Sequence, residues 1–64
     1  MDEIRNYVEI SAEDRVTGEI VKEIVVVKTK LQNPDSAERR ALSYAKSRWP
    51  VDEFKNHKSK LEPK

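Results

Sequence analysis

Two segments in the first half of the chain alternate between apolar and polar residues, as β-strands do. In residues 4–12 the apolar residues occupy even positions, namely Ile4, Val8, Ile10 and Ala12. Residues 19–31 form the second segment, whose centre is β-branched. Between the segments lie Asp14, whose carboxylate can bond to the local backbone, and Gly18, the only glycine. The pattern predicts a β-hairpin with its loop over residues 14–19.

The apolar pattern also favours one pairing register for this hairpin, because directly opposed residues share a face of the sheet. The favoured pairs are Ile10 with Val25, Val8 with Val27 and Ile4 with Leu31. A slip of two residues would place Ile10 opposite Glu23. That register fits the pattern less well and is not the one we predict.

Residues 33–50 carry the start and stop signals of a helix over residues 34–49. Asn33 before Pro34 is typical of an N-cap followed by a proline in the first turn. Asp35 and Glu38 have the spacing of a capping box and offer an alternative start. Pro50 disfavours continuation beyond the preceding residue. These signals predict one complete helix.

One side of this helix is apolar and rich in alanine, so the helix can approach a sheet closely. The apolar side consists of Ala37, Ala41, Leu42, Tyr44, Ala45 and Trp49. The three large residues of this set are expected to anchor the helix in the core. In the alternative, Tyr44 or Trp49 is a rim residue exposed to a partner.

After the helix, Phe54 is expected to close the core, and residues 54–61 form either a third strand on the hairpin edge or a frayed tail. Lysines in this segment suit an edge strand, because they discourage aggregation. The expected fold is one small α+β domain over residues 1–64, an antiparallel sheet with one helix on one face, in the order β-β-α-(β). Sixty-four residues make a marginal core, so a homodimer would bury more surface.

One helix covers only one face of a small sheet, which leaves the other face exposed. That face receives apolar residues from both strands, and exposed apolar patches tend to mark interaction sites. The predicted protein-binding residues are Tyr7, Ile20, Ile24 and Val26, with Arg5 and Lys22 at the rim. In the alternative, a bulge near Ile24 turns some of them inward.

The sequence offers little catalytic or metal chemistry. It has no cysteine, and its single histidine, His57, lies among lysines that disfavour a bound cation. Its single glycine excludes a glycine-rich phosphate loop. We therefore expect a protein that is not an enzyme and that needs no cofactor and no metal.

Basic residues in the second half suggest an alternative function in nucleic-acid binding. Residues 33–64 hold eight Lys or Arg against five Asp or Glu, a net charge of +3, whereas residues 1–32 have a net charge of −2. The candidate residues are Arg39, Arg40, Lys46, Arg48, Lys55, Lys58 and Lys60. Carboxylates interrupt this set, so nucleic acid is the weaker expectation.

No apolar run in the sequence is long enough to cross a membrane, and MDEIRNYVEI is not typical of a signal peptide. The expected location is the cytoplasm.

The run VKTKLQNPDSAERRALSYAKSRWPVDEF resembles a pattern in small phage-encoded host-takeover proteins, among them inhibitors of host RNA polymerase of the T7 type. In that pattern a strand leads into a capped, alanine-rich helix that ends in an aromatic-proline pair, and a short strand follows. The chain departs from it in having two strands before the helix and no strongly acidic strip, so no functional residue is carried over. The resemblance implies a phage early protein that binds and inhibits or redirects a bacterial host protein, in the host cytoplasm.

Overall fold

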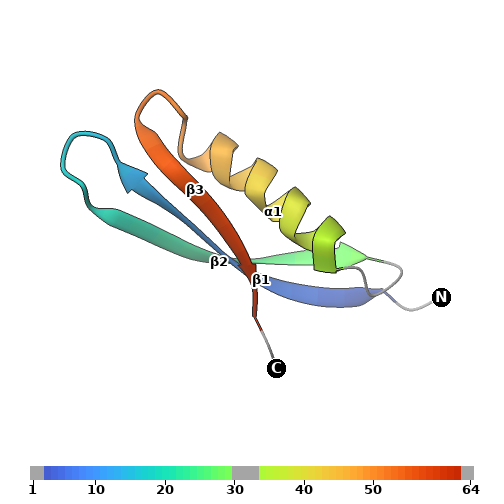
Figure 1. The fold of residues 1–64 in the computed structure, drawn as a ribbon. Coiled ribbons are helices and arrows are strands. Elements are labelled where there is room, and N and C mark those ends of the chain that lie inside the picture. The colour runs from blue at the N-terminus through green and yellow to red at the C-terminus, as the bar shows by residue number, and fades with distance from the viewer. Residues whose placement is uncertain (1–2, 30–33, 63–64) are drawn as a thin grey trace.

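The chain folds into a three-stranded antiparallel sheet with one helix lying along one of its faces (Figure 1). The structure, a computed structural model, describes residues 3–29 and 34–62. Its elements are β1 (Ile4–Asp14), β2 (Ile20–Thr29), α1 (Pro34–Arg48) and β3 (Phe54–Leu61). The predicted α+β fold with the order β-β-α-β is confirmed. Residues 54–61 form a strand rather than a tail, and the sheet order β2-β1-β3 places this strand beside β1.

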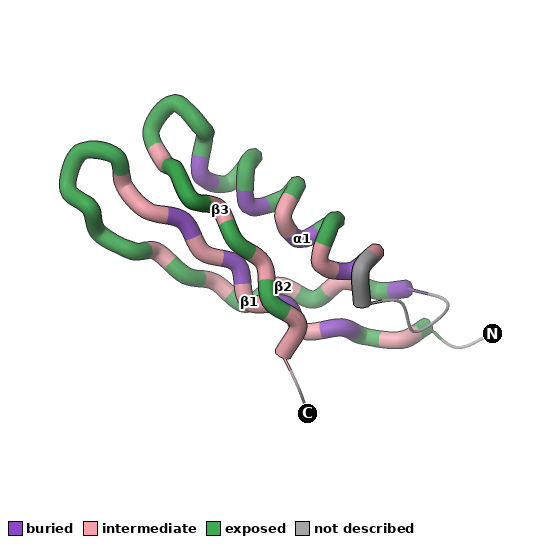
Figure 2. The backbone as a smooth tube through the Cα atoms, in the orientation of Figure 1, coloured by how far each residue is buried: buried purple, intermediate pink, exposed green. Residues whose placement is uncertain are grey.

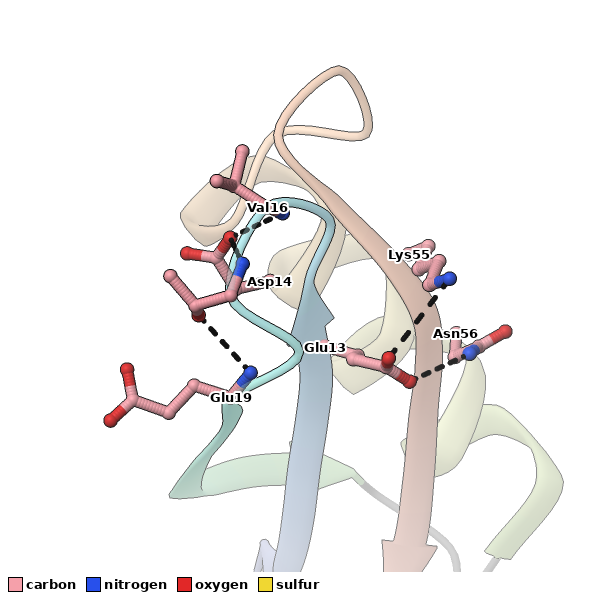
Figure 3. Close-up of polar contacts among 7 residues, drawn as sticks. Glu13, Asp14, Val16, Glu19, Lys55 and Asn56 are labelled. Carbon is pink, nitrogen blue, oxygen red and sulfur yellow. Dashed lines mark hydrogen bonds and ion pairs between the residues drawn. The ribbon is translucent and has the colours of Figure 1, made fainter.

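The loop between β1 and β2 has the geometry that Asp14 and Gly18 predict. The Asp14 N–H donates to the Glu19 carbonyl at 2.8 Å, and Gly18 adopts a φ of 77°. One carboxylate oxygen of Asp14 accepts from the N–H groups of Val16 at 2.7 Å and Thr17 at 3.1 Å (Figure 3). A side chain with a Cβ atom would be strained at the φ of Gly18, so the glycine permits this tight turn.

The tight turn sets a register that differs from the predicted one by two residues. Ile10 lies opposite Glu23, and Val8 lies opposite Val25. The prediction was wrong because it gave Glu23 no partner on the apolar side of the sheet. In the structure Arg48 of α1 supplies one, with its Nε 3.2 Å from Glu23 Oε1. Of the favoured pairs, the one with Leu31 falls partly outside the described residues, and Ile4 instead pairs with Thr29.

The sheet contains one irregularity in its described part, and it lies in β3 rather than near Ile24. The β1–β3 pairing shifts between Ser11 and Glu13, where Asn56 adopts a φ of 54°. Next to this β-bulge, the ring of His57 lies on the helix side of the sheet, where Nε2 is 2.7 Å from the Trp49 carbonyl. Because a carbonyl only accepts, Nε2 carries the proton in this contact.

The core lies between α1 and the helix-facing side of the sheet (Figure 2). Its buried residues are Val8, Ile10, Ala12, Ala37, Ala41, Ala45 and Trp49. The three alanines lie one helical turn apart, so the helix backbone approaches the sheet closely. Trp49 is an anchor, as predicted, and its ring centroid lies 6.4 Å from that of Phe54. The expectation that Tyr44 is also a core anchor is wrong, because its side chain is 46% exposed.

The first turn of α1 is tied to β3. Glu38 Oε2 accepts from the Leu61 N–H at 2.9 Å, and the Glu38 carbonyl accepts from Ser59 Oγ at 3.0 Å. The Glu38 carboxylate thus joins the helix to a strand, and the other partner of the predicted capping box, Asp35, has no described side chain. The predicted N-cap, Asn33, lies outside the described residues.

Asn6 is a buried polar residue that closes the far end of the hairpin. Its Nδ2 donates to the Val27 carbonyl at 3.0 Å and to Thr29 Oγ1 at 3.1 Å. Replacing Asn6 with alanine is expected to lower the free energy of unfolding by about 1–3 kcal/mol, because buried acceptors lose their donor. Urea unfolding followed by circular dichroism measures this loss. Ser11→Ala, on the other face of β1, is the control and should change stability little; equal losses would contradict the assigned role.

Candidate interaction surface

The face of the sheet that points away from α1 brings together side chains from all three strands, and we call it the outer face. Its members follow from the strand registers and from the alternation of side chains along each strand. They are Arg5, Tyr7, Glu9, Ser11 and Glu13 of β1, Ile20, Lys22, Ile24, Val26 and Lys28 of β2, and Lys55, Lys58 and Lys60 of β3. All six predicted protein-binding residues lie on this face.

The apolar part of the outer face runs along β2. Ile20 is 55% exposed, Ile24 is 51% exposed and Val26 is 49% exposed. Tyr7 lies directly opposite Val26 and is half-buried. The register passes through Ile24 without a shift, so the alternative of a bulge that turns this residue inward is wrong. Ile20, Ile24 and Val26 form an apolar strip along β2 that Lys22 interrupts between Ile20 and Ile24, and Tyr7 lies beside it on β1.

The charged part of the outer face is mostly basic. It carries six cations, which are Arg5, Lys22, Lys28, Lys55, Lys58 and Lys60, against the carboxylates Glu9 and Glu13. Both carboxylates lie on the central strand beside β3. Glu9 is directly opposite Lys60, and Glu13 lies 4.0 Å from Lys55 Nζ. Glu13 also accepts from Asn56 Nδ2 at 3.0 Å, as Figure 3 shows.

The structure divides the candidate nucleic-acid-binding residues between two sides of the molecule. Lys55, Lys58 and Lys60 lie on the outer face, whereas Arg39, Arg40, Lys46 and Arg48 lie on α1, across the sheet. Two of the helix cations already have protein partners. Arg40 Nη1 donates to the Lys28 carbonyl at 3.1 Å, and Arg48 contacts Glu23. The seven residues therefore do not form one continuous surface.

Sequence reasoning did not place all three lysines of β3 on the same face as the apolar strip of β2. Alternation alone would put Lys58 and Lys60 on one face and Lys55 on the other. The bulge at Asn56 moves Lys55 onto the same face as the other two. Nothing in the local sequence identifies the position of this bulge, so the basic margin of the outer face emerges only from the strand pairing.

Within residues 3–29 and 34–62, no group of three or more His, Cys, Asp or Glu side chains is arranged to hold a metal ion. No helix in that part of the chain is long and apolar enough to cross a membrane.

Comparison with protein-family models, curated proteins and solved structures gives no match for this chain. Its class therefore rests on the fold and on the surface described above. It is a small α+β domain in which one helix covers one face of a three-stranded sheet and leaves a basic, partly apolar face open.

Proposed function

We propose that this chain is a non-enzymatic module that binds another protein through the outer face. The observation that carries the proposal is the exposed strip of Ile20, Ile24 and Val26. Each of these three large aliphatic side chains is about half exposed to solvent. Burial of such side chains supplies most of the free energy of protein association.

The cations around the strip indicate the chemistry of the partner. Six positive side chains share the outer face with the apolar residues: Lys22 and Lys28 lie on the same strand, and the lysines of β3 lie across β1, where they face the two carboxylates. A partner surface with an apolar centre and an acidic margin complements this arrangement. The apolar contact provides affinity, and the charges set the orientation and speed the encounter.

The resemblance of residues 27–54 to phage host-takeover proteins extends this proposal to a class of partner. In this proposal the chain is a phage early protein that binds and inhibits or redirects a bacterial host protein in the host cytoplasm.

Substitution of Ile24 by aspartate tests the proposal. The variant should weaken partner binding by at least about 2 kcal/mol, or roughly thirtyfold in Kd, because it places a charge in the buried centre of the interface. Tagged wild-type and variant chains are incubated with bacterial lysate, with and without nuclease, and the retained proteins are compared. Circular dichroism confirms that the variant is folded.

Val16→Asp is the matched control, because Val16 is an apolar residue that is 91% exposed at the hairpin tip, away from the outer face. This variant should retain the same partner as the wild type. Equal loss of the partner in both variants would show that capture depends on nonspecific hydrophobic adsorption and not on the outer face.

Nucleic-acid binding is the second candidate function, favoured by the placement of Lys55, Lys58 and Lys60 along one exposed side of β3. It predicts duplex binding that weakens steeply as salt concentration rises. A mobility-shift titration at low salt without a shifted band would reject this function. Sedimentation of the purified chain separately tests a homodimer formed through the outer face.

A further inference from the structure

The two outer strands of the sheet have edges of different character. The edge of β3 is interrupted by the bulge at Asn56, and Glu38 binds its Leu61 N–H. The ten-residue strand β2 instead pairs with β1 without any shift in register, so its free edge is regular. One end of that edge is covered, because Arg40 Nη1 donates to the Lys28 carbonyl at 3.1 Å. A long, regular edge is a template for pairing with another strand.

The backbone groups that face this edge follow from the pairing pattern. In an antiparallel pair, alternate residues bond to the partner strand and the residues between them point away from it. Asp14 N–H bonds to the carbonyl of Glu19, which has an odd number. Because bonded residues recur at every second position, the odd-numbered residues of β2 are the ones that bond to β1. The N–H and C=O groups of Ile20, Lys22, Ile24 and Val26 therefore point to the free edge.

A groove of about 420 Å³ lies on the helix side of this edge. Residues 23–27 of β2 form one wall, and Arg40, Ala41 and Tyr44 of α1 form the other. Tyr44, which is 46% exposed, lies in this wall rather than in the core. A strand added to β2 would direct alternate side chains into this groove, because strand side chains alternate between the two faces.

The charges around the edge select the kind of strand that fits. Lys22 and Lys28 lie on its outer side, and Arg40 and Arg48 lie on its helix side. Glu23 offsets one of these cations through its contact with Arg48. A second copy of the chain would bring the same excess of positive charge against this edge, whereas an acidic strand would neutralise it.

We propose that the β2 edge and its groove bind an extended, acidic and partly apolar segment of a partner protein, which adds to the sheet as a fourth strand. Main-chain hydrogen bonds to the outward-facing groups of β2 provide affinity. The apolar side chains of the segment enter the groove beside Tyr44, and its carboxylates contact the surrounding cations. This inference goes beyond the proposed function, because it rests on the strand edge and the groove and not on the outer face.

The test follows the amides of the ¹⁵N-labelled chain by NMR while a synthetic peptide is added. The peptide has about eight alternating valine and glutamate residues, long enough to span the free edge. On binding, hydrogen exchange at the Ile24 and Val26 amides should slow at least about tenfold, because these groups gain partners. The Val25 and Val27 amides, already bonded to β1, should change little. Exchange at Ile24 and Val26 that is unchanged at saturation would overturn the proposal.

Two variants at one position separate the backbone contact from the side chain. Val26→Pro removes an N–H that points to the free edge and leaves the bonds to β1 in place, whereas Val26→Thr keeps that N–H. The proline variant should bind the peptide about tenfold more weakly than the threonine variant. Equal affinities would contradict pairing along β2.

Two further controls test which kind of strand binds to the β2 edge. A peptide of alternating valine and lysine should bind much more weakly than the glutamate peptide, and equal binding would overturn the role of charge. Sedimentation of the free chain should show a monomer. A dimer in which the Ile24 and Val26 amides are already protected would assign the edge to a second copy and overturn the proposal.

Discussion

Replacing Ile10 with aspartate is expected to unfold the domain. Ile10 has no exposed surface and lies in the core opposite Glu23, so the new carboxylate would be buried beside a residue of like charge. A domain of this size has a free energy of unfolding of roughly 3–10 kcal/mol. Burial of an unpaired charge consumes most or all of that stability. Circular dichroism and the dispersion of amide signals in an NMR spectrum measure the outcome.

Ile24→Asp is the matched control for Ile10→Asp, because it makes the same change on the adjacent strand. The new carboxylate would again lie opposite a glutamate, Glu9, but Ile24 is 51% exposed on the outer face, so this carboxylate remains in water. This variant should stay folded, with a free energy of unfolding within about 1 kcal/mol of the wild type. Unfolding of both variants would show that the outer face is covered and would remove the basis of the proposed binding surface.

Replacing Trp49 with alanine is expected to cost about 3–5 kcal/mol of stability, which is the usual range for removing a buried tryptophan. Trp49 is 7% exposed, and its ring packs against Phe54. Its backbone also connects two elements, because its N–H donates to the Ala45 carbonyl at 2.8 Å and its carbonyl contacts His57. Urea unfolding followed by circular dichroism measures the loss.

Tyr44→Ala is the control on the same helix. Tyr44 is 46% exposed, so its removal should cost less than about 1.5 kcal/mol. A loss as large as that of Trp49→Ala would show that Tyr44 contributes to the core. Such a result would also remove it from the groove wall that the fourth-strand proposal requires.

The parts of the fold that were predicted correctly depend on local chemistry. Asp14 and Gly18 form the turn because a carboxylate can bond to nearby N–H groups and glycine accepts a positive φ. The helix ends before Pro50 because that residue disfavours continuation. The two faces of the hairpin follow from alternation, which survives a slip of two residues. The membership of the outer face on β1 and β2 was therefore predictable even though the register was not.

The errors concern contacts between residues far apart in the chain. The predicted register did not place Ile10 opposite Glu23, but Arg48 of α1 provides Glu23 with a partner there. Tyr44 was expected in the core, but the alanines of α1 seat the helix so that this residue lies beside the β2 edge. In both cases the position of the helix on the sheet decides where the side chain lies. That position cannot be predicted from local periodicity.

By itself the sequence determined the order of elements, the hairpin turn, the helix and the existence of an uncovered apolar face, because turn chemistry and periodicity act over a few residues. Only the tertiary structure decided the register, the pairing of β3 with β1 and the bulge that brings Lys55, Lys58 and Lys60 to one face. It also decided which strand edge remained free, because β3 pairs with β1 rather than β2, and the bulge and Glu38 interrupt the edge of β3.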